Sequence, residues 1–264
     1  MGVATCPHDR LCRSTASASP TRLCLLNWDI IAVAYPDHFL DALGAWQNGW
    51  REQADRRAKI TETLLASIEN SSLPKEALSV DGYCYRKRFL VANNPQNGGD
   101  MLPLFGYGRL NDGVASWTTN QTFAQDFKDP IRTGTISVIF RHAPQPHEIV
   151  LNIEALWGLD DFQAAVSAYK DRKGANAGAL MHFRSRQSEV ILEAPLLRDE
   201  IIGFCGKSSP FETLCELAGL TSEEDQDQFW SALEDANAFP EEPFWLSPEG
   251  VRNVIERVRR RYGI

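Results

Sequence analysis

The chain changes character at the segment Tyr83-Cys-Tyr-Arg-Lys-Arg-Phe-Leu-Val91, which follows the turn-forming pair Asp81-Gly82. The segment contains three aromatic residues and ends in Phe-Leu-Val91, a composition typical of a β-strand. Upstream of it, apolar residues recur at helical spacing over residues 37–50 and 52–68. We therefore expect helices before residue 83 and a strand-rich region after it.

Most of the elements expected downstream are strands. They lie over residues 135–141, 148–153, 188–194 and 200–205, with one helix over 160–169. In the first of these strands, Ile136, Val138 and Phe140 alternate with other residues, so we expect them to face inward. Because helices do not regularly separate the strands, the pattern indicates a mixed α+β sandwich and not a βαβ array.

We divide the chain into four parts. Residues 1–22 lack periodicity and are expected to be a disordered or artefactual leader, and residues 23–80 form an N-terminal helical region. Residues 81–206 form the core, and residues 207–264 form an acidic helical extension. The extension has six basic and twelve acidic side chains, so it accounts for −6 of the net charge of −8. Its helix signals are two capping boxes, at 209–212 and 221–224, and a helix opening at Ser247-Pro248-Glu249.

Several classes of protein are disfavoured by composition. An apolar run of about 18 residues is missing from the sequence, as is a secretory signal, so we expect a cytoplasmic protein that does not enter a membrane. The six cysteines form no Cys-x-x-Cys pair, so free thiols are expected. Cys6, His8 and Cys12 match no zinc spacing, so no metal is expected. The net charge of −8 argues against a general nucleic-acid coat protein, but not against an enzyme that touches nucleic acid at one site.

Three short segments could carry chemistry. They are the pair Tyr85-Arg86, the hydroxyl cluster Ser116-Trp-Thr-Thr119 and the triplet Gln187-Ser-Glu189. Taken singly, each has an ordinary explanation. A strand arginine is usually a surface charge, Ser-x-Thr before a helix is usually an N-cap, and a strand glutamate is usually solvated. Their combination is more informative than any one of them.

In this order and with these separations, the segments resemble the arginine–serine–glutamate clade of the ADP-ribosyltransferases. The resemblance covers about residues 80–206, and its most specific pieces are 116–127 and Gln187-Ser-Glu-Val-Ile-Leu192. It implies an α+β fold, an ADP-ribosyltransferase-like split mixed β-sandwich with N-terminal helices and a C-terminal helical extension.

The resemblance also implies NAD⁺ as co-substrate and assigns roles to residues. Arg86 would hold the phosphates with its planar fork, although Arg88 shares its strand face and the assignment could shift by two. Glu189 would be the catalytic carboxylate that stabilises the oxocarbenium character of the ribose, as in glycoside hydrolysis. Ser116 would orient Glu189, with Thr118 on the same strand face.

Gln187 is expected to share a strand face with Glu189, because it lies two residues earlier. In the resembling family this position contacts the acceptor, and a glutamate there accompanies arginine targets. Glutamine cannot act as a base but can pair with an amide or with the edge of a nucleobase. The Gln-x-Glu form occurs in Rho-modifying bacterial exoenzymes, which target asparagine, and in relatives that modify bases. Arginine is therefore disfavoured as the acceptor.

The residues before this motif form a basic approach that we expect to be rich in loops. It comprises 169–178 and 182–186, with Lys170, Arg172 and Lys173 in the first part. In the second part, Phe183 could stack on a base while Arg184 and Arg186 meet phosphates. An ordinary solvated loop explains the same composition equally well. His142 and His147 flank a proline-containing turn, where histidines are usually surface residues.

We therefore expect a mono-ADP-ribosyltransferase that acts on RNA, DNA or protein, with a nucleic-acid base slightly favoured over an Asn or Gln side chain. A bacterial toxin or effector fits this activity best. The alternatives are an NAD⁺ glycohydrolase and a non-catalytic binding module with the same fold. The acidic extension carries aromatic residues that either pack on the protein's own core or dock a partner such as an antitoxin or immunity protein. These residues are Phe229, Trp230, Phe239, Phe244 and Trp245.

Overall fold

The computed structural model describes residues 35–49, 53–91, 99–128, 135–181, 187–208, 211–236, 238 and 242–263. Its strands are β1 (Cys84–Val91), β2 (Arg109–Leu110), β3 (Val114–Thr118), β4 (Thr135–His142), β5 (Ile149–Asn152), β6 (Glu189–Glu193), β7 (Leu196–Leu197), β8 (Ile201–Ser208) and β9 (Glu242–Trp245). Its α-helices are α2 (Asp37–Asn48), α3 (Ala54–Glu69), α4 (Gln121–Asp126), α5 (Ile153–Trp157), α6 (Asp160–Lys173), α7 (Gly178–Met181), α8 (Phe211–Ala218), α9 (Glu223–Asp235) and α10 (Pro248–Tyr262). The fold is α+β, as the sequence predicts.

Seven of the strands form one sheet with the order β5-β6-β3-β1-β4-β8-β9, and β2 pairs with β7 separately. Every strand pair in the described part of the chain is antiparallel, so the mixed strand directions implied by the resemblance are not found there. Most neighbours in this sheet are not consecutive in the chain; only β5 and β6, and β8 and β9, follow one another directly. At the centre of the sheet, β1 and β3 are joined through the pair Tyr85 and Thr118. Past this pair the two strands separate.

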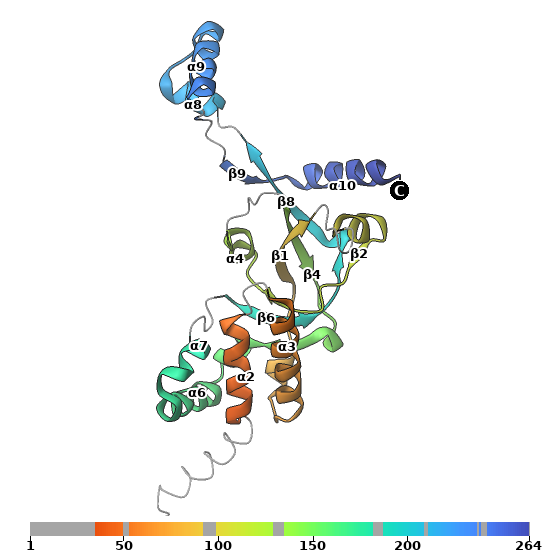
Figure 1. The fold of residues 1–264 in the computed structure, drawn as a ribbon, viewed down its shortest axis with the longest axis vertical. Coiled ribbons are helices and arrows are strands. Elements are labelled where there is room, and N and C mark those ends of the chain that lie inside the picture. The colour runs from red at the N-terminus through yellow and green to blue at the C-terminus, as the bar shows by residue number, and fades with distance from the viewer. Residues whose placement is uncertain are drawn as a thin grey trace, which may run out of the picture.

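Two hydrophobic cores lie on the two faces of the sheet. The first is built by α2, α3, α5, α6 and α7 against strand residues such as Val114 and Ile191. These helices gather below the sheet in Figure 1. The second core contains Trp117, Val190 and Phe140, and α10 covers it with Val251. Because strand side chains alternate, β6 contributes Ile191 to one core and Val190 to the other.

The expected helices over 37–50 and 52–68 are present as α2 and α3. Of the expected inward residues of β4, Val138 and Phe140 are fully buried and Ile136 is partly buried. Ser247 caps α10 as predicted, since its hydroxyl accepts from the backbone N–H of Gly250. The second capping box is displaced by one residue. Ser222 and not Thr221 caps α9, because its hydroxyl accepts the Asp225 N–H. The first capping box includes residues outside those described.

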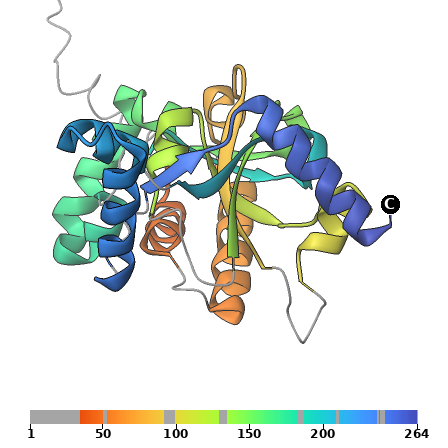
Figure 2. The same cartoon turned by 90° about the horizontal axis from the view of Figure 1, so that it is seen from above.

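The C-terminal part is not purely helical, because β9 joins the edge of the sheet beside β8. The helices α8 and α9 lie beyond the ends of these two strands, apart from the sheet and on the side away from α10 (Figures 1 and 2). Phe211 of α8 stacks on Phe229 and meets Trp230 edge to face. These two aromatic residues of the extension thus contact α8. Phe239 is outside the described residues.

Candidate active site

Glu189 is the first residue of β6 and lies on the sheet face that α2 covers. Its side chain is 5% exposed. Oε1 accepts a hydrogen bond of 2.5 Å from the Ser116 hydroxyl and one of 3.0 Å from the indole N–H of Trp46. Burial raises the pKa of Glu189 above its ordinary value, and the two hydrogen bonds oppose that rise because they favour the carboxylate. Both bonds end on the same oxygen.

Ser116 also contacts Arg86, which lies on β1, the strand on the opposite side of β3 from β6. Its backbone carbonyl accepts a hydrogen bond of 2.5 Å from Nη1 of Arg86. The contact is possible because β1 and β3 separate past the pair Tyr85 and Thr118, which leaves room for the guanidinium. Ser116 therefore contacts Arg86 through its backbone and Glu189 through its side chain. The structure brings together the three residues that the sequence motifs single out.

Arg86 belongs to a cluster of three arginines around one carboxylate. Its Nε and Nη2 donate to Oδ2 of Asp112 at 2.8 and 2.5 Å. Arg88 Nε lies 3.5 Å from Oδ1 of Asp112, and Arg57 of α3 lies 3.9 Å from the same atom. Arg88 also lies 3.9 Å from Asp100. Burial lowers the pKa of Arg86, while Asp112 opposes this effect and the neighbouring arginines reinforce it.

Among the described residues, the cluster joins the three arginines to two carboxylates, Asp112 and Asp100. The three hydrogen bonds of Arg86 to described residues occupy three of the five guanidinium N–H groups. Two N–H groups of Arg86 thus have no hydrogen bond to a described residue. A cavity of about 450 Å³ borders the cluster between α3 and the start of β3, and its charged lining residues are Arg57, Asp112 and Glu62. Of the two arginines that the sequence leaves open, Arg86 contacts Ser116.

The turn before Glu189 differs from the prediction. β6 begins at Glu189, and Ser188 has a φ of +44°, in the left-handed region that non-glycine residues seldom adopt. Strand alternation therefore does not extend back to Gln187, and the expectation that it shares a strand face with Glu189 is wrong. Thr118 holds this turn, since its hydroxyl donates to the Gln187 carbonyl at 2.6 Å. The backbone N–H of Thr119 donates to the Ser188 carbonyl at 3.0 Å.

The basic residues 169–178, which we expected to be rich in loops, are partly helical. Residues up to Lys173 belong to α6, which continues beyond the predicted end at residue 169. Arg172 donates to Asp37 at 2.6 Å, and Lys173 lies 3.7 Å from Asp41. These two cations therefore tie α6 to the start of α2. The predicted acceptor-binding residues Phe183, Arg184 and Arg186 lie outside the described residues.

His142 is buried, contrary to the expectation of a surface residue. Its Nδ1 lies 2.8 Å from Glu200 and its Nε2 2.9 Å from Glu148. The hydrogen bond to Glu200 raises the pKa of His142 against the effect of burial, and Glu148 adds to the rise. Both ring nitrogens donate only in the imidazolium form, so the site stabilises a charged histidine. The exposed His147 fits the expectation.

Three residues of the site were missed by the sequence argument, namely Trp46, Arg57 and Asp112. Trp46 and Arg57 lie on helices outside the segments that resemble the family, and Trp46 is 143 positions from Glu189. Asp112 stands in Asn111-Asp112-Gly113, whose composition is also typical of an ordinary turn. A buried tryptophan on a helix face gives no local sign of a distant carboxylate partner.

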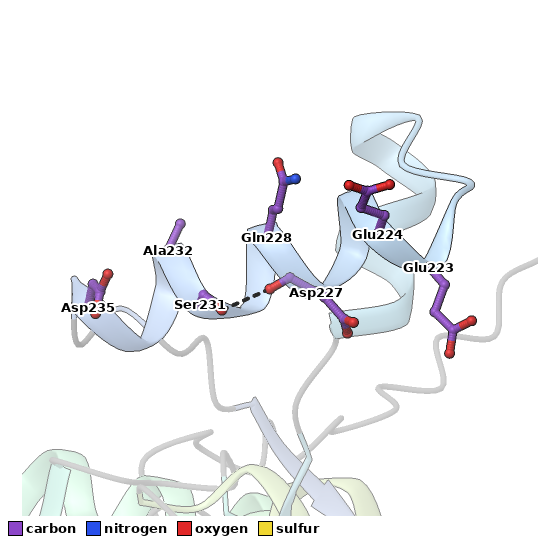
Figure 3. A pocket seen from close by; sticks show the side chains of 7 residues that line it. All are labelled: Glu223, Glu224, Asp227, Gln228, Ser231, Ala232 and Asp235. Atoms are coloured by element: carbon purple, nitrogen blue, oxygen red, sulfur yellow. Dashed lines mark hydrogen bonds between the residues drawn. The ribbon is translucent and has the colours of Figure 1, made fainter.

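A second hollow, of about 750 Å³, lies along α9, which is far from β6 in Figure 1. Figure 3 shows its lining, which includes Glu223, Glu224, Asp227 and Asp235 and no basic residue. Carboxylates repel an anionic dinucleotide, so this hollow does not suit NAD⁺.

The sequence matches no family model, and searches of curated proteins and of solved structures also found no match. Within the described ranges, no helix is long and apolar enough to cross a membrane. The same ranges contain no group of three histidine, cysteine or carboxylate side chains placed to hold a metal ion.

Proposed function

We propose that this chain is a mono-ADP-ribosyltransferase that uses NAD⁺. The observation that carries the proposal is the position of Ser116 between Arg86 and Glu189. Its carbonyl accepts from Arg86 and its hydroxyl donates to Glu189. An arginine for phosphates and a buried carboxylate for the ribose thus lie on either side of one serine, in the chain order that the resemblance implies.

The residues suit the chemistry of NAD⁺. The pyrophosphate is an anion, and the planar fork of an arginine such as Arg86 can donate hydrogen bonds to its oxygens. When the ribose–nicotinamide bond breaks, nicotinamide leaves with the bonding electrons and the ribose develops oxocarbenium character. The carboxylate of Glu189 stabilises that charge, since it is held in place and largely shielded from water. The acceptor then forms a bond to the same ribose carbon and loses a proton.

Gln187 supports an acceptor that carries an amide or an amide-like edge. Its backbone is held beside the catalytic strand by Thr118, and its side chain is one that pairs with amides and bases but cannot remove a proton. We therefore place a nucleic-acid base slightly ahead of an asparagine or glutamine side chain and disfavour arginine. Such an enzyme fits an intracellular bacterial toxin or effector, which would be controlled by an antitoxin or immunity protein.

The test is to incubate the purified chain with labelled NAD⁺ and cell lysate, and to follow both released nicotinamide and macromolecular label. We expect label that is removed by RNase, DNase or protease and that is absent with Glu189→Gln. Nicotinamide release without any label would indicate an NAD⁺ glycohydrolase. NAD⁺ binding without nicotinamide release would indicate a non-catalytic binding module. Gln187→Glu should impair labelling while sparing nicotinamide release.

A further inference from the structure

The helix α2 supplies a direct hydrogen bond to the candidate catalytic carboxylate, although it lies outside the segments that resemble the family. Trp46 is 2% exposed, and its indole N–H lies 3.0 Å from Oε1 of Glu189. An indole N–H can only donate, and a carboxylate can only accept. In this hydrogen bond Trp46 is therefore the donor, and the bond stabilises the ionised form of Glu189.

The position of Trp46 is fixed at both ends of its helix. At the start of α2, Asp37 pairs with Arg172, and the Tyr169 hydroxyl donates to Asp41. Near the end of α2, Trp46 reaches the sheet and Glu189. The apolar residues between these contacts, Phe39, Leu40 and Leu43, are fully buried in the first core. Because α2 is held along its length, the indole is in place before any ligand binds.

Trp46 and Ser116 approach Glu189 from different sides of the sheet face, one from a helix and one from the neighbouring strand. Two donors on one oxygen fix the rotation of the carboxylate. They also leave Oε2 without a hydrogen bond to any described residue. That second oxygen is the one suited to a ribose hydroxyl or to the developing positive charge.

We propose that Trp46 is a positioning residue of the active site, which holds the Glu189 carboxylate in the orientation that faces the ribose of NAD⁺. The inference rests on the proposed function. It makes the N-terminal helix α2 part of the catalytic unit and not a separate appendage. A form of the chain that lacks α2 would retain Arg86, Ser116 and Glu189 but would lose one of the two donors to the carboxylate.

The test compares Trp46→Phe with Trp157→Phe. Trp157 is the matched control, because it packs against the same core while its indole N–H is buried without a hydrogen-bond partner among the described residues. For Trp46→Phe we expect kcat for nicotinamide release to fall about tenfold, the effect of one hydrogen bond, with KM for NAD⁺ changed less than threefold. The acid limb of the pH profile should move to higher pH. Trp157→Phe should leave kcat and the acid limb of the pH profile unchanged.

A second readout does not depend on catalysis. In the ¹⁵N-labelled wild-type protein, the indole N–H resonance of Trp46 should shift as Glu189 titrates, and the shift should vanish in Glu189→Gln. An indole resonance insensitive to pH, or a pH profile unchanged in Trp46→Phe, would overturn the assignment. If the resonance titrates but wild-type protein releases no nicotinamide, the proposed function fails and the catalytic role of Trp46 fails with it. The two failures are therefore distinguishable, even if Trp46→Phe does not fold.

Discussion

The Ser116 hydroxyl lies 2.5 Å from Oε1 of Glu189, while the Ser116 carbonyl accepts from Arg86. The hydroxyl can rotate to donate, and the bond it makes favours the ionised carboxylate over the neutral acid. Because β3 and β6 are paired in register at Thr118 and Glu189, the contact is built into the sheet.

Substitution of Ser116 by alanine removes one of the two donors to Glu189. The backbone carbonyl remains, so the contact with Arg86 should persist. We expect kcat for nicotinamide release to fall about tenfold and the acid limb of the pH profile to move upward, since the pKa of Glu189 rises further when a donor is lost. The measurement is kcat against pH. An unchanged acid limb would mean that Ser116 does not control the ionisation of Glu189.

Lysine substitutions separate the two candidate NAD⁺-binding arginines. Lysine keeps the charge but loses the planar fork, so Arg86→Lys should raise KM for NAD⁺ about 10- to 100-fold. Arg88→Lys should have a smaller effect, because Arg88 makes longer contacts with Asp112 and none is recorded with Ser116. The KM for NAD⁺ of each variant shows which of the two arginines binds NAD⁺. A larger effect at Arg88 would shift the assignment by two residues.

Glu189 should cost stability at neutral pH. Its folded-state pKa lies above the ordinary value, so the free energy of unfolding falls as the pH rises through that pKa. Glu189→Gln keeps an oxygen acceptor for Ser116 and Trp46 but removes the buried charge. We expect it to be more stable than wild type at pH 7.5 by about 1–3 kcal/mol. In urea unfolding the difference should close near pH 4, and a constant difference would contradict the buried-charge explanation.

His142 should produce the pH dependence expected of a stabilised imidazolium. Its folded-state pKa is raised, so its contribution is fully present below the ordinary value of 6.5 and is lost as the pH rises through the raised pKa. His142→Gln should lower the free energy of unfolding by roughly 2 kcal/mol at pH 6, because Glu148 and Glu200 lose their shared cation. The loss should be smaller at pH 9. A loss of equal size at pH 6 and pH 9 would contradict the stabilised imidazolium.

The sequence predicts the elements whose local patterns are strong. β4 follows from alternating apolar residues, β1 follows from its aromatic and apolar composition, and α10 follows from Ser247 and Pro248 at its start. β9 was not predicted, since it is four residues long and contains Pro243. Proline is tolerated there because β9 is the edge strand of the sheet. Its pairing with β8 is set by tertiary contacts.

The candidate site was predictable only where the residues lie in recognisable segments. Arg86, Ser116 and Glu189 each lie in such a segment, and strand pairing brings them together. Trp46 and Asp112 could not be found in this way, because their roles depend on which distant side chain the fold places beside them. The left-handed Ser188 likewise breaks the strand alternation on which the expectation for Gln187 rested.

The central claim is tested most directly by the rate at which the purified chain releases nicotinamide from NAD⁺, measured for wild type, Glu189→Gln and Glu193→Gln. Glu193 is a matched control, since it lies on the same strand but is exposed at the far end. We predict that Glu189→Gln lowers kcat about 10²- to 10³-fold, while Glu193→Gln retains the wild-type rate. Equal rates for wild type and Glu189→Gln, or no release by any of the three, would contradict the account.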